Sequence, residues 1–340
     1  MVIFWTMSIS DYLDEYFENP VIKGYLAVSA IIGTALGPMS PGSAYVLLHH
    51  YMGDVDGNVG AWGFARGGMG AITQALKNSF EDAGGEIRAG SGVARVLVKN
   101  GRAYGVALEN GDTYMGNRIV SNMDVKRTFL KHVDEDDLPG DFVRQVKNFK
   151  IRGSSGKLNI ALDAAPKFTA LPEGAPMYRG DLHFTDSIER MERAYDDWKA
   201  GHFMSCFVQY APPKIEGRDW SDADRDAFGQ TVIDQIEDYA PGFKNLILHA
   251  EVRTPRELEA EVGLTEGNIF QGELTFDQLL FNRPVPGYAQ YRSPIKDLWI
   301  CGSSTHPGGG VMGAPGRNAA AEILRETRGP NQISDAYAVF

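Results

Sequence analysis

A glycine-rich loop late in the sequence has the residue types needed to hold an anionic or electron-rich group. The apolar run 298–301 precedes Gly302, and an alanine-rich stretch that favours a helix follows Gly316. Glycine lets the backbone approach a neighbouring group closely, and a following helix points its first N–H groups and its positive dipole end at that place. The loop therefore suits a phosphate, a carboxylate or the edge of a cofactor ring.

The same loop contains the pattern G-x-G-x-x-G at Gly308, Gly310 and Gly313. A dinucleotide-binding unit also needs a second strand after the helix and an acidic residue ~20 positions further on. No buried strand is predicted after Gly313, so the pattern does not predict a complete nucleotide fold. The alternative is a plain strand-to-helix turn that uses glycine for tightness.

Other candidate catalytic groups are few. His49 and His50 are neighbours that point in different directions on a predicted helix, which favours satisfied histidines over a metal site. Ser303, Ser304 and His306 lie close together but lack a placed acid, so they do not predict a catalytic triad. The motifs G-x-S-x-G, C-x-x-C and H-E-x-x-H are absent from the sequence. No catalytic residue and no metal ligand is assigned.

Composition narrows the class of protein. The 340 residues are 43% hydrophobic and 23% charged, which is typical of a soluble globular protein with one large or two ordinary domains. A net charge of -11 argues against a nucleic-acid partner. The two cysteines, Cys206 and Cys301, indicate a reducing compartment, and a cytoplasmic location is expected, or the mitochondrial matrix in a eukaryote. The apolar run 21–39 favours a buried helix over a membrane-surface helix.

The elements around the glycine loop indicate a mixed fold. A second glycine loop, 62–70, opens a helix predicted at 71–83. Asn100-Gly101 and Asn110-Gly111 suit tight hairpins, so the chain between 93 and 115 is predicted to be a β-meander. A short strand at 118–121 follows it.

The remaining segments predict helices and a largely antiparallel sheet. Helices are expected after Ser8 or Ser10, from Asn19-Pro20 toward Gly33, and at 44–52. The later elements are strands at 157–162, 203–209 and 246–252 and amphipathic helices at 187–199 and 223–239. The acidic patch 134–137 is expected to be a solvated loop.

Several segments together resemble the phytoene dehydrogenase-related FAD-dependent oxidoreductases, including the group of pyridine nucleotide-disulphide oxidoreductase domain-containing protein 2. The most specific is Cys301-Gly-Ser-Ser-Thr-His-Pro-Gly-Gly-Gly-Val-Met-Gly-Ala-Pro-Gly-Arg-Asn-Ala-Ala320. The others lie at 41–50, 60–70, 121–124, 239–243, 267–270, 277–278 and 283–286.

The resemblance implies an α/β plus α+β protein. One part is a partial FAD/NAD(P)-binding domain of the GR2 or amine-oxidase-like kind, which contains the β-meander and spans residues 62–125 and 293–328. The other is an antiparallel-sheet substrate-binding domain with helices, residues 1–61 and 126–292. The cofactor contacts implied by the family are Gly67, Gly68, Val93, Gly302, Ser303, Gly310, Val311 and Met312. The implied chemistry is hydride removal from an apolar small-molecule substrate to the flavin of FAD.

The sequence also departs from the family pattern. It lacks the βαβ unit with G-x-G-x-x-G and an acidic residue that holds the AMP half of FAD, so we expect a truncated chain with impaired or absent FAD binding. Without the strands of that unit, apolar edges would be left open to a partner chain or a homo-oligomer, and peripheral membrane contact is also expected as an option. A non-catalytic remnant, or a ligand-binding or interaction module that keeps the substrate domain, is the alternative function.

Overall fold

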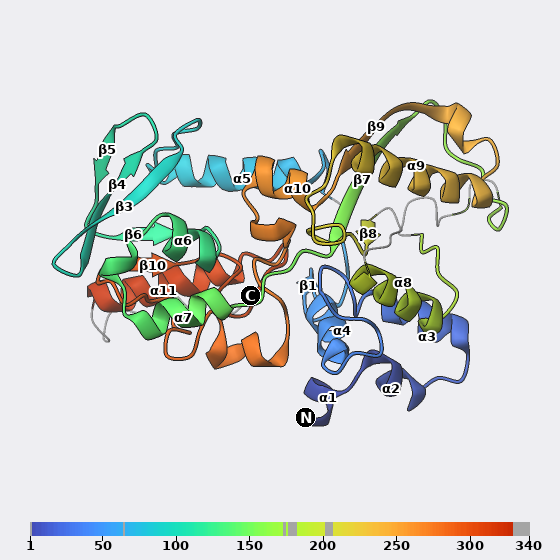
Figure 1. The fold of residues 1–340 in the computed structure, drawn as a ribbon, viewed down its shortest axis with the longest axis horizontal. Helices are drawn as coiled ribbons and strands as arrows, with labels where there is room; N and C mark the ends of the chain where they lie inside the picture. The colour runs from blue at the N-terminus through green and yellow to red at the C-terminus, as the bar shows by residue number, and fades with distance from the viewer. Residues whose placement is uncertain (1, 64, 173–174, 176–181, 201–206, 329–340) are drawn as a thin grey trace.

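The computed structural model describes residues 2–63, 65–172, 175, 182–200 and 207–328. Two lobes of mixed helix and sheet lie side by side (Figure 1). One lobe contains the meander, the strand that precedes the late glycine loop, and the last helix. The other contains an antiparallel sheet and the N-terminal helices. The mixed helix and sheet class predicted from the sequence is confirmed.

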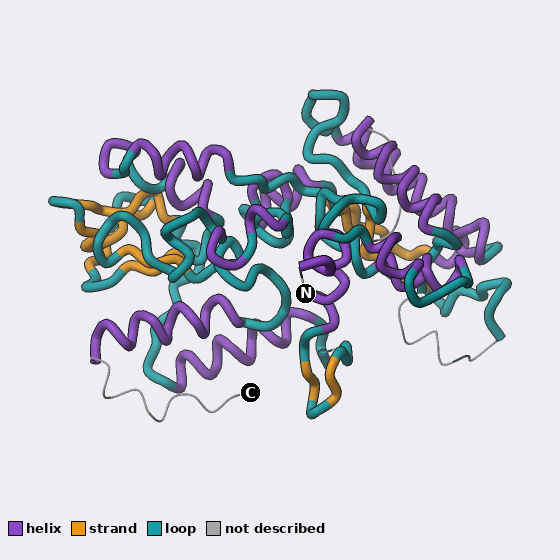
Figure 2. The backbone as a smooth tube through the Cα atoms, turned by 90° about the horizontal axis from the view of Figure 1, so that it is seen from below, coloured by secondary structure: helices purple, strands orange, loops and turns teal. Residues whose placement is uncertain are grey.

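The helices occur in both lobes and between them, as the tube view also shows (Figure 2). Their bounds are α1 Val2–Thr6, α2 Ile9–Asp14, α3 Pro20–Val28, α4 Ser43–Tyr51, α5 Met69–Asp82, α6 Val125–Lys131, α7 Gly140–Asn148, α8 Ile188–Ala200, α9 Asp222–Tyr239, α10 Pro255–Glu257 and α11 Ala314–Arg328. Ser8 caps α2 and Asn19 caps α3, as their residue types predict. The helix from Pro20 ends at Val28, short of the expected Gly33, because the backbone turns over 29–34.

Among the described residues, the strands form four small sheets. Their bounds are β1 Asp54–Val55, β2 Asn58–Val59, β3 Val93–Lys99, β4 Arg102–Leu108, β5 Thr113–Met115, β6 Ile119–Ser121, β7 Ser155–Leu162, β8 Phe207–Gln209, β9 Ile247–Arg253 and β10 Leu298–Ile300. The orders are β1-β2, β10-β6, β3-β4-β5 and β8-β7-β9. The predicted meander is therefore confirmed, and β8 confirms the part of the 203–209 strand that lies within the described residues.

The β6–β10 pair is parallel, with Leu298 opposite Ile119 and Ile300 opposite Ser121. Both strands lie against a core that also includes the meander and the helices α6 and α7. Phe129 of α6 and Phe142 of α7 meet edge to face there, with ring centroids 4.9 Å apart. The sequence did not predict these two helices. They complete the support beneath the strand that leads into the late glycine loop.

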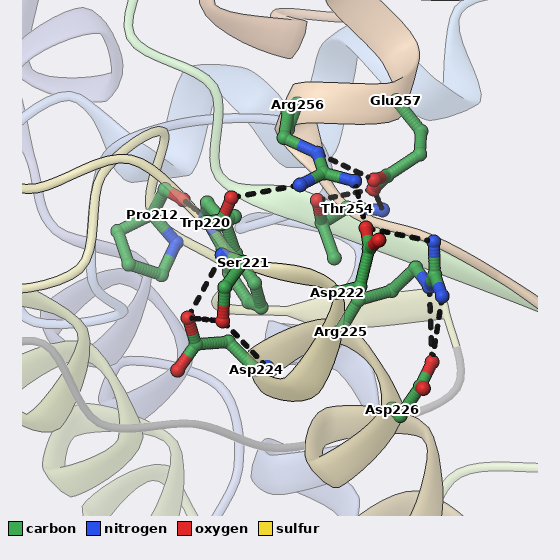
Figure 3. Close-up of polar contacts among 10 residues, drawn as sticks. All are labelled: Pro212, Trp220, Ser221, Asp222, Asp224, Arg225, Asp226, Thr254, Arg256 and Glu257. Atoms are coloured by element: carbon green, nitrogen blue, oxygen red, sulfur yellow. Dashed lines mark hydrogen bonds and ion pairs between the residues drawn. The ribbon is translucent and has the colours of Figure 1, made fainter.

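The second lobe packs α9 on the antiparallel sheet. Phe228, Val232 and Ile236 are buried against it, as their helical spacing predicts, whereas Tyr239 is half-exposed. A polar network fixes the start of this helix (Figure 3). Ser221 and Asp224 form a capping box, and Arg256 bridges Asp222 and the carbonyl of Trp220. This surface network orders the junction of α9 with α10.

The N-terminal apolar run is buried on one side only. Ala27 and Ala30 are fully buried, while Val21, Ile22 and Tyr25 on α3 remain exposed. The acidic patch 134–137 is exposed, as predicted. Across the described residues, every helix is too short or too polar to cross a bilayer.

Candidate functional site

The late glycine loop joins β10 to α11 and changes from buried to exposed along its length. Gly302, Gly308 and Gly309 are buried in the first part. The tip then emerges, with Val311 72% exposed and Met312 45% exposed. Two apolar side chains displayed beside glycine backbone, immediately before a helix N-terminus, form a surface on which a flat group can lie.

Glycine is required at the buried positions because neighbouring atoms lie too close to leave room for a side chain. A Cβ on Gly302 would lie 2.5 Å from the carbonyl oxygen of Asn122, and one on Gly309 would lie 3.0 Å from the Cα of Phe270. Neither distance leaves room for a side chain. Gly310 instead has φ near 140°, a conformation open to glycine. The loop is thus a tightly packed backbone segment.

Arg283 anchors the loop from below. Its side chain is completely buried, and its guanidinium donates to the carbonyl of Ser303 from both Nε (3.2 Å) and Nη2 (2.7 Å). The remaining donors bond the carbonyls of Phe270, Gly272, Glu273 and Gln278. Burial lowers the pKa of this guanidinium to about 10, so it stays charged at neutral pH.

His49 of α4 ties the loop to the N-terminal helices. Its Nε2 lies 2.7 Å from the carbonyl oxygen of Gly309, and the ring is buried. Burial lowers the pKa of His49, so the ring is neutral and Nε2–H donates to this carbonyl. The Nδ1 atom is then a buried acceptor with no hydrogen-bond donor in the described structure.

His50 turns the other way along α4. Its Nδ1 lies 2.8 Å from the carbonyl of Val46, and burial lowers its pKa to about 4. Each histidine makes a side-chain hydrogen bond to a backbone carbonyl, so the prediction of satisfied or solvent-facing histidines holds for His50 and only in part for His49, whose Nδ1 has no partner among the described residues. Within the described residues no group of three potential ligands is placed to hold a metal ion.

An aromatic surface adjoins the loop. His49 and His50 both meet the ring of Phe270, at centroid distances of 5.8 and 5.9 Å. His50 also meets the ring of Trp62, whose Nε1–H donates to the carbonyl of His50. Trp62 is 49% exposed, so this surface reaches solvent. An apolar ligand could lie against it.

The predicted cofactor contacts fall into two groups. Gly302, Ser303, Gly310, Val311 and Met312 lie together in the late loop. Gly67 and Gly68 lie at the start of α5, and Val93 begins β3 in the separate meander. No described hydrogen bond joins those three residues to the late loop.

The hydroxyl of Ser304, near His306, ties the loop to neighbouring backbone. Ser304 Oγ donates to the carbonyl of Gln271 (2.6 Å) and accepts from the N–H of Val125 (3.1 Å). Sequence reasoning missed Arg283 and Phe270 as loop supports, and it did not connect His49 to Gly309. The only signal for them was their place within the segments that carry the family resemblance.

The late loop fits one side of a flavin. Its tip is apolar and exposed, α11 directs its first turn at it, and buried acceptors around it lack donors, namely His49 Nδ1 and Gln271 Oε1. A ring system with its own N–H and C=O groups matches a wall with these properties.

Comparison with solved structures supports the mixed helix and sheet fold. A solved structure of an oxidoreductase from Methanosarcina mazei matches 94% of this chain and 68% of that one, with a TM-score of 0.54 and 14% sequence identity. At that identity the likeness shows the fold alone. No family profile matches the chain.

Two relatives found by sequence comparison are named as an oxidoreductase and a desaturase. The chain is 38% identical to pyridine nucleotide-disulfide oxidoreductase domain-containing protein 2 of Rattus norvegicus, over 95% of this chain and 61% of the relative. It is 22% identical to a lycopene-forming phytoene desaturase of Pantoea ananas, over 94% of this chain and 66% of that protein. The chain is thus a relative of these oxidoreductases, as its sequence predicted, and spans less than two thirds of their length.

Proposed function

We propose that this chain supplies the flavin-facing and substrate-facing walls of an FAD-dependent oxidoreductase. The observation that carries the proposal is the late loop, whose buried glycines hold an exposed apolar tip in front of α11. When bound, FAD would supply the acceptor for a hydride taken from a C–C or C–N bond of the substrate.

The late loop would hold the flavin through Gly302, Ser303, Gly310, Val311 and Met312. The resemblance adds Gly67, Gly68 and Val93 as further contacts and assigns residues 62–125 and 293–328 to a partial FAD-binding domain. Residues 1–61 and 126–292 would then bind the substrate. The core that α6 and α7 share with the meander supports grouping these two helices with the proposed FAD-binding part.

The substrate in this proposal is an apolar small molecule. The ring of Trp62 is half-exposed beside the loop, and the rings of His50 and the buried Phe270 pack behind it. Neutral His50 adds no charge there. These side chains would orient the substrate and exclude water, and no residue is assigned as a base.

We further propose that FAD binds this chain weakly. These 340 residues contain no βαβ unit for the AMP half of FAD, so the contacts to that half would have to come from elsewhere.

Titration of FAD fluorescence against the purified chain tests the function. Val311→Asp places a carboxylate on the exposed tip and should raise the FAD dissociation constant about tenfold or more, since it repels the electron-rich ring face. Leu248→Asp on β9, also at an exposed apolar position, should leave it unchanged. Absence of any FAD binding by the unsubstituted chain would reject the function for these 340 residues.

The second candidate is an interaction module, which the bare face of α5 favours. This helix buries no residue, and Met69, Leu76 and Phe80 are exposed along it. The β6 edge away from β10 is short, and Val120 on β6 is 46% exposed. A polypeptide that adds a parallel strand to β6 would cover that edge.

Sedimentation of the chain with and without Leu76→Lys distinguishes the second candidate. A self-associated chain that becomes monomeric in the variant would show that α5 carries a homo-oligomer contact. A monomer at all concentrations would remove the homo-oligomer from consideration. Binding to neutral lipid vesicles, assayed in parallel, tests the proposed peripheral membrane contact.

A further inference from the structure

Arg283 carries a buried charge that no carboxylate balances. Its five carbonyl partners come from two chain segments and are Phe270, Gly272, Glu273, Gln278 and Ser303. The nearby carboxylate of Glu273 is held by Arg152, with Nε to Oε1 at 2.7 Å. In the described ranges, no ion pair includes Arg283.

A comparison with Arg152 shows how unusual this is. Arg152 and Glu273 form a two-point pair whose charges cancel, and Arg152 is partly exposed. Arg283 is completely buried, and among the described residues its counterparts are carbonyl dipoles and the face of the Phe149 ring, whose centroid lies 5.8 Å from Cζ. A buried cation normally needs an anion nearby, because dipoles offset only part of the lost hydration.

The field of this charge reaches the loop. Burial is the main reason that the pKa values of His49 and His306 are lowered, and the charge of Arg283 lowers both further. A Cβ placed on Gly308 would lie 3.7 Å from Arg283 Nε, so the guanidinium is directly beneath the loop backbone.

The geometry points to Arg283 as the residue that positions the loop. Its positive charge, which no ion pair balances in the described residues, would favour a group bound at the loop when that group gains negative charge. This inference rests on the proposed flavin site and deepens it. A hydride carries two electrons and one proton, so a hydride acceptor bound at the loop would gain a unit of negative charge. Arg283 would hold the loop in place through Ser303 and stabilise the reduced cofactor relative to the oxidised one.

The first test measures the potential at the loop without FAD. Paramagnetic relaxation of the Gly310, Val311 and Met312 amides by anionic and cationic nitroxides reports which charge accumulates there. In the unsubstituted chain the anionic-to-cationic ratio should exceed the mean of the other exposed amides, against the overall charge of -11. A ratio at or below that mean would overturn the inference.

Substitutions test whether Arg283 is the source of the positive potential at the loop. Arg283→Gln should lower the ratio at these amides, Arg283→Lys should retain most of it, and Lys244→Gln, an exposed cation after α9, should leave it unchanged. If Arg283→Gln does not fold, the Lys variant and the unsubstituted ratio still decide the question. Equal ratios in folded Arg283→Gln and the unsubstituted chain would sink the idea.

The second test uses FAD itself. Anaerobic titration should show that Arg283→Gln weakens binding of reduced FAD about tenfold more than binding of oxidised FAD, the effect of one charge at an intermediate distance. Arg283→Lys should rescue this preference, which a purely structural role would not do. A chain that binds FAD in neither state would refute the proposed function, and the nitroxide ratios would then decide the inference about Arg283.

Discussion

Two glycine loops in this protein open a helix, and they use glycine for different purposes. At Gly67 and Gly68 the backbone has positive φ, and a Cβ on Gly68 would meet no atom within 4 Å. At Gly302 and Gly309 a Cβ would collide with backbone. The first loop needs glycine because its backbone has positive φ. The second loop needs glycine because neighbouring backbone leaves no room for a side chain. Glycine content alone therefore does not identify a binding site.

The helices after the loops differ in the same way. α5 buries no residue, whereas α11 buries Ala319 and packs Ile323 against the cluster that contains Trp299. The helical spacing of apolar residues exists in both. Periodicity predicts which face of a helix seeks a partner, but a partner must also be present.

Alanine at the two loops should give the largest difference. Gly302→Ala should lower the free energy of unfolding by about 2–3 kcal/mol, because the new methyl group overlaps the Asn122 carbonyl. Gly68→Ala should cost about 1 kcal/mol, because only its positive φ is strained. Urea unfolding of both variants measures this, and equal losses would refute the distinction.

Acidification should destabilise the fold through His50. The backbone carbonyl of this residue accepts a hydrogen bond from Trp62 of the first glycine loop. The pKa of His50 is about 4 in the folded chain and near 6.5 when unfolded. Its depressed folded value contributes stability that is present above about pH 6.5 and lost as pH falls toward 4. At pH 5 the loss should be about 2 kcal/mol.

His50→Phe removes this titration. Its unfolding free energy should fall less than that of the unsubstituted chain between pH 7.5 and pH 5, in urea titrations at both values. His249→Phe, at an exposed position of β9, controls for the loss of one imidazole. An unchanged pH dependence in His50→Phe would show that other groups cause the acid sensitivity.

The two helices should give the smallest effect. Leu76→Ala on α5 should change the free energy of unfolding by less than about 0.5 kcal/mol, because the side chain is 67% exposed. Ile323→Ala on α11 should cost about 1–2 kcal/mol, since its side chain is half-buried. A large loss for Leu76→Ala would mean that α5 is covered in solution, which thermal unfolding at several protein concentrations would reveal.

Local sequence signals predicted most of the elements. Asn-Gly turns located the meander, and Ser8 and Asn19 located two helix starts. These signals work because capping and turn geometry depend on neighbouring residues. The helices α6 and α7 were missed, although both bury a face in the first lobe.

The site was predictable only in part, for a different reason. The late loop was visible in its own residues, but its supports come from distant segments. Arg283 reaches Ser303, and His49 reaches Gly309 across 260 positions. No spacing rule joins such residues, since tertiary packing brings them together. The grouping of Gly67, Gly68 and Val93 with the late loop stays a prediction from family resemblance.

The parallel pairing of Ile119 with Leu298 also sets an order of events during synthesis. Val125 must likewise wait for Ser304, which is 179 positions away. While the ribosome makes the intervening lobe, β6 and the apolar core beside it lack their parallel neighbour. Closing so long a loop is slow, and an unpaired strand is prone to aggregate meanwhile. A chaperone that shields β6 until residues 298–300 emerge would therefore raise the yield of folded protein.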